Sequence, residues 1–231
     1  MAEAGRRLVI AIDGPVGAGK STAARRLAAA LGYVYIDSGA MYRAFGWKAV
    51  RDGVDLHERN GLAALAARTD IRIRLSASGP RVLVDGLDVT DELRTPRMDE
   101  ASSLVSVWPE VRERLVALQR AMAAAGGVVM DGRDIGTVVL PDADLKFYLD
   151  ADPDVRAARR LRELERTGVP GDLAAVRAEV LRRDARDSGR TASPLRPAAD
   201  AIRVDSTGLD ADAVLARLLR EAGKRSRSAN S

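Results

Sequence analysis

Short apolar runs alternate along the chain with longer segments in which apolar residues recur every three or four positions. The short runs are typical of buried strands, and the recurring spacing is typical of amphipathic helices. The runs predict strands at residues 8–13, 33–37, 128–130, 145–149 and 201–204. The spacing predicts helices at residues 20–31, 41–51, 109–125, 153–166, 172–186 and 210–222. Strands and helices that alternate in this order predict an α/β fold with a mostly parallel sheet.

One segment follows a different period. Residues 71–75 alternate apolar side chains with arginine, and a turn, a second short run at 81–85 and another turn come next. A period of two is typical of antiparallel strands with one exposed face. We therefore expect residues 55–99 to form a small antiparallel subdomain inserted into a domain that spans residues 1–224. The basic residues 225–231 are expected to be a disordered tail.

The charge and the composition argue against several classes of protein. The net charge is +4, but residues 1–7 contribute +1 and residues 221–231 contribute +2, which leaves a body of about +1. This near-neutral body, with 3% aromatic residues, argues against a nucleic-acid partner. The absence of cysteine excludes disulfides and thiol catalysis, and a single histidine, His57, argues against a Ser-His-Asp triad. No apolar run approaches the ~20 residues of a membrane span, and no signal peptide is evident, so we expect a cytoplasmic protein without a membrane partner. We also expect a monomer.

The clearest motif is GPVGAGKS at residues 14–21, which fits the pattern G-x-x-x-x-G-K-[ST]. A predicted strand precedes it and a predicted helix follows it. Glycines let backbone N–H groups surround phosphate oxygens at the positive end of a helix. The pattern predicts that Lys20 reaches the β- and γ-phosphates of a nucleotide and that the Ser21 hydroxyl binds Mg²⁺. A tight strand-to-helix turn without a ligand is the alternative.

The residues expected to bind ATP are consecutive: Gly14, Pro15, Val16, Gly17, Ala18, Gly19, Lys20, Ser21 and Thr22.

Two further motifs follow predicted strands, at the sheet edge where open α/β sheets bind ligands. DSGAMYR at residues 37–43 ends in Arg43, whose fork of donors suits a second phosphate, although Asp37 and Ser38 alone are also typical of a helix cap. DGRDIGT at residues 131–137 combines two carboxylates, an arginine and two glycines. A turn held by its own aspartate side chains is the alternative there.

A fourth motif, RRDARDSGR at residues 182–190, places Arg183, Asp187 and Arg190 on one helix face. If this segment moves, its arginines could neutralise the charge of a transferring phosphoryl group. The alternative is that the motif is only a helix end held by salt bridges. The two asparagines, Asn60 and Asn230, do not form the N-K-x-D motif that reads guanine, which counts against a GTPase.

These four motifs, in this order and with the insert, resemble the bacterial cytidylate kinases, a family of nucleoside monophosphate kinases. The resemblance covers residues 8–222. It implies a three-layer α/β/α P-loop kinase fold with a five-stranded parallel sheet, an inserted NMP-binding subdomain and a short lid at residues 167–192. It also implies transfer of the γ-phosphoryl group of ATP to CMP or dCMP, with Mg²⁺.

The resemblance implies a role for each matching residue. The CMP site would be lined by Ser38, Tyr42 and Arg43. The cytosine would face Ser103, Arg112 and Asp134. The sugar would be held by Arg183 and Asp187. Charge on the phosphates would be neutralised by Lys20, Arg43, Arg133, Arg186 and Arg190.

The chemistry needs no general base, because an oxygen of the CMP phosphate is already an anion. No separate carboxylate for the metal is evident in the sequence, and Asp37 is a candidate for its outer shell. Two rival functions stay open. One is a kinase for another nucleotide or small metabolite on the same scaffold. The other is a P-loop ATPase or switch, for which a basic stripe and stacking aromatics would be expected.

Overall fold

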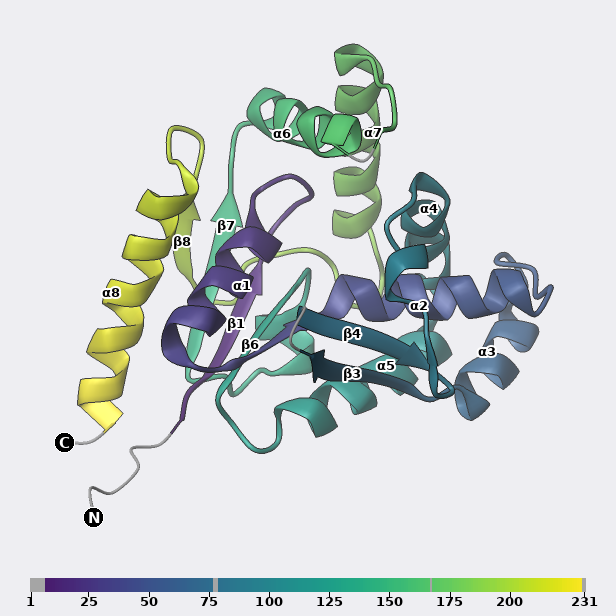
Figure 1. Cartoon of the computed structure of the whole chain (residues 1–231), viewed down its shortest axis with the longest axis horizontal. Helices are drawn as coiled ribbons and strands as arrows, with labels where there is room; N and C mark the ends of the chain where they lie inside the picture. The colour runs from purple at the N-terminus through teal and green to yellow at the C-terminus, as the bar shows by residue number, and fades with distance from the viewer. Residues whose placement is uncertain (1–6, 77–78, 167, 230–231) are drawn as a thin grey trace. The chain divides into compact units, whose positions relative to one another are not determined.

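The computed structural model describes residues 7–76, 79–166 and 168–229, and these form two compact units (Figure 1). The first unit, here the phosphate-loop unit, contains the described residues up to Tyr35 and from Ala125 onward. The second, here the inserted unit, is Ile36–Ala124. It is larger than the insert at 55–99 that we expected. Residues 1–6 of the expected domain and Thr167 of the expected lid lie outside the described residues.

The main sheet has five strands in the order β2-β6-β1-β7-β8. These are β2 (Val34–Asp37), β6 (Val128–Gly132), β1 (Val9–Asp13), β7 (Leu145–Asp150) and β8 (Ile202–Asp205). β1 pairs in parallel with β6 and β7, and β7 pairs in parallel with β8. All of β6 and nearly all of β1 are buried, which explains why both read as continuous apolar runs. The predicted parallel core is confirmed.

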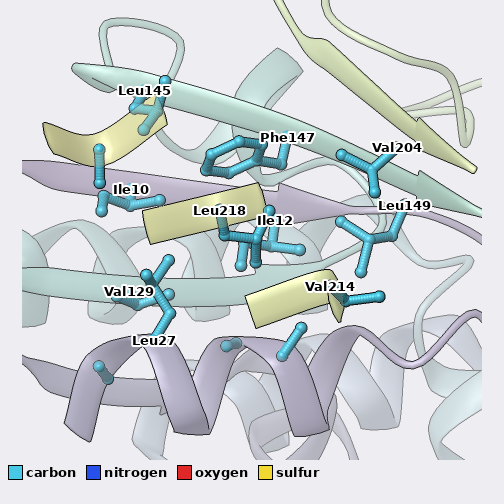
Figure 2. Packing of buried hydrophobic residues seen from close by; sticks show 14 of the residues in the cluster. Ile10, Ile12, Leu27, Val129, Leu145, Phe147, Leu149, Val204, Val214 and Leu218 are labelled. Carbon is cyan, nitrogen blue, oxygen red and sulfur yellow. The ribbon is translucent and has the colours of Figure 1, made fainter. Parts of the chain in front are cut away.

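Two helices pack together over this sheet, α1 (Lys20–Leu31) and α8 (Ala211–Ala229) (Figure 1). Figure 2 shows the core they close: Leu27 of α1 and Val214 and Leu218 of α8 meet strand residues such as Ile12 and Phe147. We expected a disordered tail from residue 225, but α8 continues to Ala229. Residues 230 and 231 lie outside the described residues.

A second pair of helices, α6 (Pro153–Arg166) and α7 (Leu173–Ser188), forms a smaller cluster in the phosphate-loop unit. Ala157, Val176 and Val180 are its buried centre, and Val16 of the loop after β1 packs against it. This packing places α6 and α7 beside the phosphate loop within one unit.

The inserted unit is mostly helical. Its helices are α2 (Ser38–Arg51), α3 (Arg59–Arg68), α4 (Pro96–Val105), α5 (Pro109–Ala123) and the short 3₁₀ helix η1 (Thr90–Glu92). The predicted antiparallel sheet is confirmed as β3 (Ile71–Ser76), β4 (Gly79–Val84) and β5 (Leu87–Asp88).

Helix predictions failed at three places in the inserted unit. α2 begins at Ser38 rather than residue 41, because the Asp37 carboxylate accepts the Ala40 N–H at 2.8 Å and caps the helix there. α3 and α4 were not predicted. Each buries few large apolar side chains and is capped by a polar residue, Glu58 or Thr95, so the apolar spacing along the chain is weak.

No helix among the described residues is long and apolar enough to cross a membrane.

Candidate active site

The loop from β1 into α1 has a backbone that demands glycine. Gly14, Gly17 and Gly19 have φ angles of 149°, 76° and 89°. A Cβ on Gly14 would lie 1.9 Å from the Leu149 carbonyl oxygen, and one on Gly17 would lie 2.7 Å from the Arg156 carbonyl oxygen. Gly19 provides no side-chain cap for α1, so the first N–H groups of that helix are arranged to receive an anion. The geometry supports the predicted phosphate loop.

Lys20 is buried, with 5% of its surface exposed, and its Nζ donates a hydrogen bond to the Pro15 carbonyl oxygen at 2.7 Å. Burial and the nearby Arg133 guanidinium lower the pKa of Lys20 to about 7, against the opposing effect of Asp131, Asp13 and Asp187. A phosphate anion at the loop would favour the charged ammonium. The buried amine of Lys20 therefore makes a hydrogen bond within the loop, and its predicted contact with the nucleotide phosphates stays a prediction.

Ser21 donates a hydrogen bond from Oγ to Oδ2 of Asp131 at 2.8 Å, and the Tyr35 hydroxyl donates to Oδ1 of the same carboxylate at 2.9 Å. Asp131 is buried at the end of β6. Sequence reasoning did not single out this carboxylate as a partner of Ser21. The available signal was an aspartate directly after the apolar run at 128–130, within a motif that we had singled out.

The donor set fits Mg²⁺, which binds one or two protein oxygens and completes its shell with phosphates and water. Ser21 and Asp131 offer a hydroxyl and a carboxylate. No cluster of three or more acidic, histidine or cysteine side chains that could hold a metal ion occurs in the described part of the chain. Asp37, the candidate from the sequence for the outer shell of the metal, caps α2 and pairs with Arg43 in the inserted unit, and its role at the metal stays a prediction.

Asp187 of α7 holds two of the predicted arginines. Its Oδ2 lies 2.9 Å from Arg133 Nε and its Oδ1 lies 2.5 Å from Arg190 Nη2. Burial alone would raise the pKa of Asp187, but the charges of Arg133 and Arg190 hold it below its usual value. The carboxylate thus links the loop after β6 to the end of α7.

The other predicted residues of the phosphate-loop unit vary in position. Asp134 is buried just before the π-helical turn η2 (Ile135–Val139). The positive charge of Arg183 helps to lower the pKa of Asp187. Arg186 is exposed on α7. Thr22 is exposed in the first turn of α1.

Arg156 of α6 and Asp184 of α7 were not predicted, and they attach both helices to the phosphate loop. Nη1 of Arg156 donates to the Val16 carbonyl oxygen at 3.1 Å and lies 2.5 Å from Asp184 Oδ2. Asp184 Oδ1 also accepts the Val16 N–H at 3.4 Å. No local signal separates these two residues from the many other charged residues of α6 and α7.

The inserted unit carries the remaining predicted residues: Ser38, Tyr42, Arg43, Ser103 and Arg112. Arg43 lies 3.1 Å from Asp37 Oδ2 and 3.7 Å from Asp99 Oδ1. The Arg112 guanidinium carbon lies 5.6 Å from the centre of the Tyr42 ring, and both residues are buried. Ser38 and Ser103 are buried as well. Of the predicted residues, the unit therefore holds Arg43, which is partly exposed, and the buried cation–aromatic pair of Arg112 and Tyr42 on neighbouring helices.

A glycine loop between a parallel strand and a helix, with Lys20 and the paired Ser21 and Asp131, defines a P-loop nucleotide-binding protein. The family model described as "Cytidylate kinase" matches residues 10–224. A cytidylate kinase of Pelotomaculum thermopropionicum is 52% identical over 219 residues, which cover 94% of this chain and 97% of that protein. One of Desulfitobacterium hafniense is 51% identical over 93% of this chain and 92% of its own. The chain belongs to the cytidylate kinase family.

Among solved structures, a gluconokinase from Sinorhizobium meliloti 1021 covers 96% of this chain and 97% of its own, with 15% identity and a TM-score of 0.48. So distant a likeness carries no argument about the site.

Proposed function

We propose that this protein transfers the γ-phosphoryl group of ATP to CMP or dCMP, giving ADP and CDP or dCDP. The observation that carries this proposal is the phosphate loop, where buried Lys20 is followed by Ser21, whose hydroxyl donates to Asp131 at the end of β6. Membership of the cytidylate kinase family over residues 10–224 supplies the choice of nucleotide.

On the donor side, residues 14–22 bind the phosphates of ATP. Backbone N–H groups of the loop surround the β-phosphate, and Lys20 contacts the β- and γ-phosphates. Ser21 and Asp131 would hold Mg²⁺, which when bound neutralises phosphate charge and orients the γ-phosphate. The Asp131 carboxylate in turn keeps the Ser21 hydroxyl in place, as the 2.8 Å hydrogen bond supports.

On the acceptor side, Ser38, Tyr42 and Arg43 bind the nucleoside monophosphate, with Arg43 and Arg133 on its phosphate. Ser103, Arg112 and Asp134 face the cytosine. A fixed carboxylate at Asp134 accepts from the C4 amino group of cytosine and repels the O4 of uracil. Arg183 and Asp187 hold the sugar.

The transfer step is a displacement at the γ-phosphorus. A CMP phosphate oxygen forms a bond to that phosphorus while the bond to the β–γ bridging oxygen breaks, and the electron pair leaves with ADP. Because the attacking oxygen is already an anion, the protein contributes position and positive charge instead of a base. Lys20, Arg133, Arg186 and Arg190 supply that charge. Exclusion of water by the lid segment prevents hydrolysis of ATP.

The test is a coupled ADP-release assay with CMP, dCMP, UMP, AMP and GMP, run with and without Mg²⁺. The proposal predicts turnover with CMP and dCMP and a kcat/KM for CMP at least ~10²-fold above that for UMP. Equal turnover of UMP and CMP would contradict a cytidylate kinase and leave a general monophosphate kinase. ADP release that needs no monophosphate would indicate an ATPase.

We also propose that the protein acts as a cytoplasmic monomer without nucleic-acid or membrane partners. The near-neutral charge of the body supports the absence of a nucleic-acid partner. Light scattering coupled to gel filtration at micromolar concentration tests the oligomeric state.

A further inference from the structure

Asp13 is a buried carboxylate that the reaction itself does not use. It ends β1, directly before Gly14, and 3% of its surface is exposed. Its Oδ1 accepts the Ile135 N–H at 2.8 Å, and its Oδ2 accepts the Gly136 N–H at 2.7 Å. One carboxylate thus satisfies two consecutive backbone donors of another element. Such charge-assisted hydrogen bonds are stronger than neutral ones.

The two donors belong to the first residues of η2, the turn that follows Arg133 and Asp134. Asp134 precedes η2 and makes no side-chain hydrogen bond that caps it. Asp13 supplies that cap from β1 instead. Since an uncapped buried N–H costs free energy, the turn depends on this carboxylate.

The end of β1 also holds the other end of the segment of Arg133 and Asp134, which connects β6 to η2. β1 pairs with β6, and in this register Ile12 is opposite Asp131 and Asp13 is opposite Gly132. Arg133 and Asp134 are therefore a two-residue connection held at both ends by the end of β1. Their backbone has little freedom left, so their side chains leave it in fixed directions.

The turn packs closely against its neighbours at position 136. A Cβ on Gly136 would lie 3.1 Å from Lys146 Cδ and 3.4 Å from Asp13 Oδ2. A larger residue there would require only a small shift of the Lys146 side chain, so the distances show close packing of the turn against β1 and β7.

We propose that Asp13 is a positioning residue for phosphoryl transfer, which fixes Arg133 and Asp134 by capping the turn that follows them. The inference rests on the proposed function, because that function gives Arg133 its phosphate and Asp134 its cytosine. Asp13 acts through these two residues and does not touch the substrate. A displacement of about 1 Å in such groups is enough to slow catalysis strongly.

Asp13→Asn tests this role, because asparagine keeps the shape but turns one acceptor into a donor that faces an N–H. Asp144→Asn is the matched control. Oδ2 of Asp144 accepts the Val9 N–H at 2.8 Å, which is the same kind of bond at the opposite end of β1. Five quantities are measured on each protein: kcat and KM for CMP and UMP at saturating ATP, the Kd for ATP, amide hydrogen exchange at Ile135 and Gly136, and the melting temperature.

For Asp13→Asn we expect kcat/KM for CMP to fall at least ~10-fold, the CMP-to-UMP preference to shrink, and the Kd for ATP to stay within ~3-fold. Exchange at Ile135 and Gly136 should become faster. Asp144→Asn should leave all of these near wild type, whatever its melting temperature. Faster exchange with unchanged CMP kinetics would overturn the positioning role, as would a lower melting temperature alone. An inactive wild-type protein would instead refute the proposed function, and the positioning role with it.

Discussion

Replacing Lys20 with methionine separates catalysis from stability at the phosphate loop. The ammonium is buried, and its pKa is lowered from 10.5 to about 7, chiefly by burial and then by Arg133. At pH 7 the folded state therefore bears a cost on the order of 4 kcal/mol for this group, and the cost disappears as the pH rises toward 10.5. Methionine removes this cost and loses the bond to Pro15, worth about 1 kcal/mol. We expect a melting temperature at or above that of wild type and a kcat at least ~10²-fold lower.

The assay is coupled ADP release with CMP, together with thermal unfolding at pH 7. Lys146→Met is the matched control. Lys146 is also buried, but its Nζ pairs with Asp200 and lies on β7. That variant should lose stability and keep its kcat. If Lys20→Met kept near wild-type turnover, the loop would not be the ATP site. If it lost turnover only because it melted at a much lower temperature, the reasoning about burial would be wrong.

Four further predictions concern separate parts of the site. Asp134→Ala should reduce the CMP-to-UMP ratio of kcat/KM more than it changes the Kd for ATP. Arg43→Ala should weaken the binding of CMP and UMP alike, because a phosphate contact does not distinguish the bases. Steady-state kinetics with both substrates test the two variants. Arg190→Ala should lower kcat and leave ATP binding mostly intact, and a loss of stability without a kinetic effect would restore a plain salt bridge with no catalytic part. Asp131→Asn should raise the Mg²⁺ concentration for half-maximal activity about tenfold, as measured by titration, and an unchanged requirement would remove Asp131 from the metal site. Burial, opposed by two backbone hydrogen bonds, raises the pKa of Asp13 from 3.8 to about 6, so the contribution of Asp13 to stability is greatest at low pH and is lost as the pH rises through 6. Denaturant unfolding should therefore show that the wild type loses about 2 kcal/mol of unfolding free energy relative to Asp13→Asn between pH 4 and pH 7. A constant difference in unfolding free energy would contradict the burial argument.

The sequence by itself determined the features that depend on neighbouring residues. The bounds of α1 were predicted to the residue, because Gly19 and Gly32 at its two ends adopt left-handed backbone conformations that glycine permits. The phosphate loop was predictable for the same reason, because its glycines, Lys20 and Ser21 are close together in the sequence. The strand and helix order followed from apolar periodicity, and it failed for α3 and α4, where that periodicity is weak.

Tertiary structure alone decided which distant residues complete the site. Ser21 and Asp131 are 110 positions apart, and Asp13 and Ile135 are 122 apart, so no spacing along the chain reveals either contact. Both contacts exist because β1 and β6 are adjacent in the sheet although they are far apart in sequence. The arginines of α7 gave a similar ambiguity, because a salt-bridged helix end and a phosphate-binding cluster share one pattern. Only the fold places Asp187 against Arg133, since the direction of a side chain depends on what packs beside its helix.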